Sequence, residues 1–102
     1  MRMLMTVRCP LEPFNTLIRK GTAGDVIGRI LETIKPEAAY FTEQEGQRGA
    51  LLVINMESPS QIPFFAEPWF LQLNATCEFR VAMTADDLKK SGLSELGKKW
   101  GQ

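Results

Sequence analysis

The chain of 102 residues lacks histidine altogether. It also has few other reactive side chains, with two cysteines and one tyrosine. Histidine is the commonest acid–base group near neutral pH, so its absence weakens the case for an enzyme without excluding a carboxylate mechanism. Two cysteines without histidine are also far short of a zinc site. We therefore expect no metal and no cofactor, and we expect Cys9 and Cys77 to be small buried thiols.

An excess of charge of one sign and a long apolar run are missing as well. Twelve basic and twelve acidic residues give a formal net charge of zero, unlike the basic footprint of a nucleic-acid-binding protein. No window approaches the roughly 20 apolar residues of a membrane span, and the N-terminus does not suit a signal peptide. The sequence predicts a cytoplasmic protein without nucleic-acid or membrane partners, in which near-neutral charge permits self-association.

Short segments of alternating apolar and polar residues predict β-strands with unlike faces. These strands cover residues 1–9, 37–43, 50–56 and 75–83. The third is a nearly continuous apolar run, which suits a central strand buried on both faces. Glu45-Gly46-Gln47 predicts a hairpin turn before it, because glycine readily adopts the positive φ of tight turns.

Apolar residues at helical spacing fill the intervals between the strands. A short helix, a break near Gly21 and a longer helix over 23–34 are expected first, the longer one starting with a capping box at Thr22. Ser58-Pro59-Ser60-Gln61 is the strongest helix start in the chain, because serine caps and proline suits the first helical position. We expect that second helical region to be short, since Pro68 should end or kink it.

The resulting order is β-α-β-β-α-β in a single domain over residues 1–102, with a helical tail over 84–102. Right-handed crossovers place the helices on one face of a four-stranded antiparallel sheet, the α+β ferredoxin-like arrangement with first and last strands adjacent. The bare sheet face favours pairing with a second copy, so we expect a homodimer. The apolar stripe of the tail either folds back or reaches the partner, and we prefer the partner.

The run MESPSQIPFFAEPWFLQLNATCEFRVAM over 56–83 carries a resemblance to known proteins. Its acidic-Ser-Pro helix start, Pro-aromatic turn and glutamate-bearing last strand resemble the C-terminal half of the dimeric α/β-barrel superfamily, with the muconolactone isomerases the nearest members. The first half resembles them in element order alone. KPEAAYFTE and IPFFAEPWFLQLNA also resemble a group of small bacterial proteins of unassigned function. The resemblance implies a dimeric α/β barrel that binds small organic molecules between helices and sheet.

One polar cluster lies on the first and last strands, on the face away from the cysteines. Its members are Thr6, Arg8, Thr76, Glu78 and Arg80. If Cys9 lies opposite Cys77, the same register places Arg8 opposite Glu78 and Thr6 opposite Arg80. We favour a cross-strand salt bridge packed against another subunit; the alternative is a charge presented to an anionic ligand inside the barrel.

Five residues are the remaining candidates for a ligand pocket: Tyr40, Glu67, Trp69, Asn74 and Arg80. Glu67 is the best candidate for a catalytic group, because burial in its apolar turn would raise its pKa toward acid–base use. Trp69 is also a natural core residue. We predict a homodimer that binds an apolar or weakly acidic small molecule without catalysis; the alternative is a muconolactone isomerase-like enzyme with a carboxylate acid–base. The sequence identifies neither ligand nor pathway.

Overall fold

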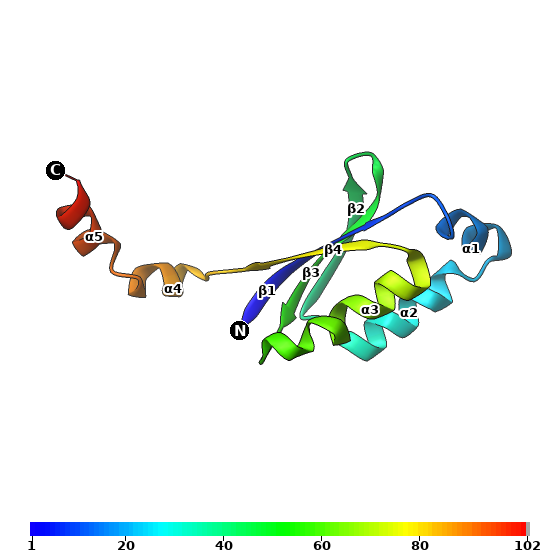
Figure 1. The fold of residues 1–102 in the computed structure, drawn as a ribbon, viewed down its shortest axis with the longest axis horizontal. Coiled ribbons are helices and arrows are strands. Elements are labelled where there is room, and N and C mark those ends of the chain that lie inside the picture. The colour runs from blue at the N-terminus through cyan, green and yellow to red at the C-terminus, as the bar shows by residue number, and fades with distance from the viewer. Residues whose placement is uncertain (102) are drawn as a thin grey trace.

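The fold is a mixed α+β domain, seen in a computed structural model that describes residues 1–101 (Figure 1). One antiparallel sheet has the strand order β2-β3-β1-β4, which is compatible with the expected ferredoxin-like arrangement. Its strands are β1 (Arg2–Cys9), β2 (Ala38–Gln44), β3 (Gln47–Asn55) and β4 (Thr76–Val81). The helices are α1 (Phe14–Lys20), α2 (Ala23–Ile34), α3 (Ile62–Leu73), α4 (Ala85–Lys90) and α5 (Leu93–Trp100).

The hydrophobic core lies between α2, α3 and one face of the sheet. The largest fully buried side chains are Met5, Val7, Leu52, Ile54, Trp69 and Leu73. Those on β1 and β3 are alternate residues, because successive strand side chains point to opposite faces. The opposite side, called here the open face, is covered by no element within residues 1–101 and carries Leu4, Thr6, Arg8, Tyr40, Leu51, Glu78 and Arg80.

The open face corrects one expectation about the central strand. On β3, Ala50, Leu52 and Ile54 are buried on the core face, while Leu51 and Val53 on the open face are half-buried. A continuous apolar run therefore does not mean burial on both faces in the single chain. The predicted hairpin before β3 is confirmed, since Glu45 and Gly46 have φ values of 53° and 81°, as a two-residue turn of the primed type requires.

The helices differ from the sequence prediction in two respects, the cap of α2 and the length of α3. α2 spans Ala23–Ile34 as predicted, and Gly21 ends α1 in the left-handed conformation with φ 75°. The predicted capping box at Thr22 is wrong, because its side chain makes no cap hydrogen bond. Its hydroxyl donates instead to the Leu17 carbonyl at 3.5 Å, which leaves the start of α2 without a side-chain cap.

The second correction concerns Pro68, which lies inside α3 and does not end it. A 3₁₀ turn over Pro59–Gln61 leads into this helix, and Ser58 Oγ accepts a hydrogen bond from Ser60 N at 3.3 Å. The apolar segment expected as a turn is therefore the second half of a helix that ends at Leu73. Burial of Trp69 and Leu73 in the core offsets the backbone hydrogen bond that proline cannot make.

The first and last strands are adjacent as predicted, but their register differs by two residues. Val7 lies opposite Cys77, Arg8 opposite Thr76, and Thr6 opposite Glu78. The expected Arg8–Glu78 pair is therefore wrong: Arg8 pairs with Glu45 at the hairpin, and Glu78 pairs with Arg80 on its own strand at 3.2 Å. A shift of two keeps every side chain on its predicted face, so alternation alone cannot detect it.

The tail extends away from the body (Figure 1). Thr84 and Asp87 form a capping box at the start of α4, and Gly92, with φ 79°, separates α4 from α5. The radius of gyration is 17.4 Å, against about 13 Å for a compact chain of similar length. The apolar side chains of the tail are exposed: Leu88, Leu93, Leu96 and Trp100. In the described chain, each helix falls short of the length and apolar character needed to cross a membrane.

Candidate functional site

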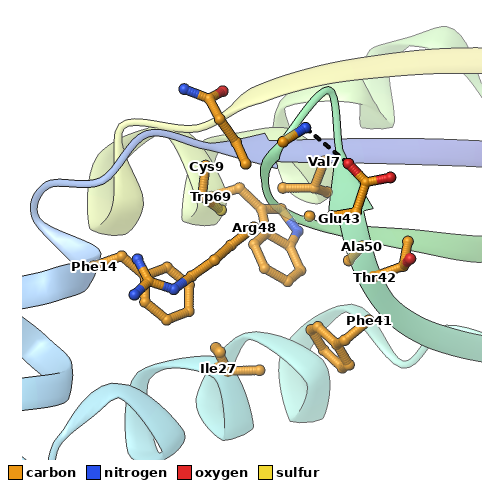
Figure 2. Close-up of a pocket in the computed structure, with 13 residues that line it drawn as sticks. Val7, Cys9, Phe14, Ile27, Phe41, Thr42, Glu43, Arg48, Ala50 and Trp69 are labelled. Carbon is orange, nitrogen blue, oxygen red and sulfur yellow. Dashed lines mark hydrogen bonds between the residues drawn. The ribbon is translucent and has the colours of Figure 1, made fainter.

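A cavity of about 440 Å³ lies between the helices and the sheet, beside the β2–β3 hairpin (Figure 2). Its volume falls within the range of about 300–1,000 Å³ that is usual for small-molecule sites. The lining is mainly apolar, and its larger apolar side chains are Val7, Phe14, Ile27, Phe41 and Trp69. A cavity of this kind can hold a small molecule with an apolar body.

Six secondary-structure elements place the lining side chains around one space, with Val7 contributed by β1. Trp69 comes from α3, Phe14 from α1 and Ile27 from α2, while Phe41 lies on β2. Ala50 lies opposite Phe41 on β3 and also lines the cavity. Because its side chain is a single methyl group at a core-facing position, it leaves room that a larger residue would fill.

Arg48 is the one basic residue that lines this cavity within residues 1–101. It lies opposite Cys9 on β1 and Glu43 on β2, so it faces the helices rather than the open face. Its guanidinium carbon is 4.7 Å from the centre of the Phe14 ring, a cation–π contact. The Glu43 carboxylate accepts a hydrogen bond from Gly46 N at 2.7 Å.

Two buried nitrogens at the cavity have no hydrogen-bond partner within residues 1–101: Arg48 Nη1 and Trp69 Nε1. Only 1% of the Trp69 surface is exposed, so bulk water cannot accept a hydrogen bond from its N–H group. Leaving a buried donor unsatisfied costs about 1–3 kcal/mol, and such groups in folded proteins call for an explanation. The cavity region therefore holds two donors that no acceptor within residues 1–101 satisfies.

The two thiols do not supply a nucleophile. Burial raises the pKa of Cys9, which lines the cavity, although the nearby charge of Arg48 acts in the opposite direction. Burial, with a smaller contribution from Cys9, raises the pKa of Cys77 to about 12. Both cysteines are free and protonated at neutral pH, whereas a reactive cysteine needs its thiolate form. No cluster of three or more potential metal ligands occurs among residues 1–101.

Of the five residues expected at the pocket, Trp69 alone lines the cavity. Glu67 is exposed in a shallow groove between α2 and α3, so the burial expected for it is absent. Tyr40 and Arg80 lie exposed on the open face. Asn74, with φ 52°, ends α3 in the left-handed conformation. These residues do not form one site.

Sequence reasoning missed Arg48, although the sequence carries a signal for it. Alternation along QRGALLVIN places Arg48 on the same face as Ala50, Leu52 and Ile54. A charged residue at a core-facing strand position departs from the pattern and marks a place worth examining. Because the predicted strand began at Ala50, Arg48 fell outside it.

The fold and the cavity define this chain as an α+β protein with an apolar pocket between its helices and its sheet. In comparisons with known proteins, no protein family, curated protein or solved structure matches it.

Proposed function

We propose that this protein binds a small organic molecule in the cavity between helices and sheet, and that it carries out no chemistry on it. The supporting observation is the cavity itself, whose apolar walls surround two hydrogen-bond donors without acceptors. A ligand with an apolar body and an oxygen acceptor would bury its surface there and satisfy these donors.

The side chains around the cavity favour binding over catalysis. A general base must be within hydrogen-bond reach of the proton that it removes. Glu67, the predicted acid–base residue, lies in a different groove. Glu43 does line the cavity, but its carboxylate stabilises the hairpin through Gly46. With Cys9 protonated, the lining holds no activated nucleophile.

The proposal includes a homodimer formed through the open face. Leu4, Leu51 and Val53 are half-buried apolar residues there, and the same face carries basic Arg8 and Arg80 beside acidic Glu45 and Glu78. A surface with both signs of charge can meet its own copy across a two-fold axis. The exposed apolar stripe of α4 and α5 would then pack on the partner.

Titration with the neutral dye N-phenylnaphthylamine, which fluoresces more strongly in apolar surroundings, tests whether the cavity binds ligands. We expect the intact chain to bind the dye, and we expect Ile27→Trp to weaken binding at least about tenfold by filling the cavity. Leu31→Trp is the matched control, because Leu31 is a half-buried core residue of α2 that does not line the cavity. Equal loss in both variants would contradict the proposal, and so would the absence of binding both of the dye and of an aromatic acid of similar size.

A further inference from the structure

Arg48 is placed as a ligand-binding residue would be. Its position on β3 faces the helices, where the following alternate residues are Ala50, Leu52 and Ile54, all buried. A residue that only kept the sheet soluble would lie on the open face. At this position Arg48 is half-buried, with its guanidinium beside Phe14. Partial burial strengthens its interaction with a negative charge, because the surroundings screen less than water does.

The protein itself does not neutralise this guanidinium. The ion pairs found within residues 1–101 involve four of the other five arginines (Arg2, Arg8, Arg19 and Arg80) and two lysines (Lys90 and Lys98). Neither Arg48 nor Arg29 takes part in one, and of these two only Arg48 lines the cavity. Glu43 is its direct neighbour across the sheet, yet the Glu43 carboxylate bonds to the hairpin backbone. Arg48 Nη1 consequently has no acceptor.

We infer that the ligand is a small organic acid with a planar apolar body, whose carboxylate pairs with Arg48. The inference rests on the proposed function and names the ligand class for the same cavity. A guanidinium presents parallel N–H groups that match the two oxygens of a carboxylate, and such charge-assisted bonds are roughly twice as strong as neutral ones. The aromatic walls formed by Phe14, Phe41 and Trp69 suit a flat ring.

Binding includes a rotation of the Arg48 side chain. Figure 2 shows the guanidinium turned toward Phe14 and away from the indole nitrogen of Trp69, and neither unsatisfied nitrogen is in contact with solvent. The long arginine stem allows the guanidinium to leave the ring and meet an incoming carboxylate.

The test compares a naphthoate with the naphthamide of the same isomer as competitors of bound N-phenylnaphthylamine. The two compounds share shape and ring system and differ in charge. We expect the acid to bind the intact chain at least about tenfold more tightly than the amide. Arg48→Met should abolish this preference, with the dye affinity of each variant measured first, and Arg48→Lys should retain part of it. Arg8→Met is the matched control, because it removes one arginine from the open face and should leave the preference intact.

The outcomes separate this inference from the proposal on which it rests. Dye binding with equal affinities for acid and amide overturns the carboxylate assignment and leaves the cavity proposal standing. A preference that survives Arg48→Met overturns the role of Arg48. If the dye does not bind, calorimetric titration with the naphthoate tests the inference directly. Heat of binding that disappears in Arg48→Met supports the inference. Absence of any heat of binding overturns both the inference and the cavity proposal.

Discussion

At the scale of single residues, Arg48 and Gly49 give β3 two roles. Arg48 lines the cavity, and Gly49 allows close packing of the strands. Arg48 places a charge where a core residue would otherwise lie, and its desolvation is offset only in part by Phe14. Gly49 is required by close packing, because an added Cβ would lie 2.7 Å from the Val7 carbonyl oxygen and would also overlap Gln44. The strand therefore approaches β1 closely at the point where the cavity begins.

Burial of Cys77 also predicts that its thiol reacts slowly. The pKa of Cys77 is raised to about 12, mainly by burial, so little thiolate forms near neutral pH. In a Cys9→Ala chain, we expect the remaining thiol to react with a disulfide reagent at about pH 8 at least tenfold more slowly than in the urea-unfolded chain. Equal labelling rates for the folded and unfolded chains would show that Cys77 is accessible and ordinary.

The raised pKa of Cys77 determines how the stability of the protein changes with pH. The unfolded chain releases the Cys77 proton near its ordinary pKa of 9.0, and the folded chain does so at about 12. The contribution of this thiol to the free energy of unfolding is therefore full below about pH 9 and is lost as the pH rises toward 12.

At the scale of elements, α3 shows tertiary packing prevailing over local propensity. Its proline at position 68 has no N–H for the Phe64 carbonyl, yet the helix continues to Leu73. The same helix places Phe65 and Ala66 in the core before the proline, and Trp69 and Leu73 after it. If the helix ended at Pro68, Trp69 and Leu73 would not be held against the sheet.

Replacement of Pro68 measures the cost of this conflict. Pro68→Ala restores the missing backbone hydrogen bond, so we expect the free energy of unfolding in urea to rise by about 1–3 kcal/mol. Pro63→Ala is the control, because Pro63 lies in the first turn of α3, where proline is tolerated, and should change stability by less than about 0.5 kcal/mol. Equal effects of the two substitutions would mean that Pro68 is not strained.

At the scale of the whole molecule, two apolar surfaces lack a cover within the described chain: the open face and the tail. An isolated helix of fewer than about 12 residues is marginal in water, yet α4 and α5 have 6 and 8 residues and do not pack on the body. Packing on a second copy would cover both surfaces at once. This geometry favours the proposed dimer over a tail that folds back.

Shortening the chain after Met83 tests the role of the tail. If the stripe packs on the partner, sedimentation equilibrium should show a dimer for the full chain at micromolar concentration and a dissociation constant at least about tenfold higher for the shortened chain. A monomeric full chain would reject the dimer, and unchanged affinity after shortening would reject the role of the tail.

A full-length control distinguishes the apolar stripe from the length of the tail. Replacing Leu93, Leu96 and Trp100 by glutamine keeps the Thr84 capping box and removes the exposed apolar groups. We expect the same loss of affinity as in the shortened chain, because the apolar side chains supply the association energy.

The sequence by itself determined the elements and their order. Alternation fixed which face each residue of β1 and β4 occupies, Gly21 and Gly46 marked a helix end and a turn, and Thr84 capped the tail. These are local effects of backbone conformation and hydrogen bonding, so neighbouring residues carry the information.

Tertiary structure alone decided the register, the length of α3 and the composition of the cavity. A shift of two residues between β1 and β4 preserves alternation, so the pairing of Val7 with Cys77 depends on how the strands are held by the rest of the fold. Helix α3 continues past Pro68 because burial of Trp69 in the core stabilises the helical turn that follows the proline. The cavity joins Phe14, Arg48 and Trp69, which are distant in the chain and meet only when the helices pack on the sheet.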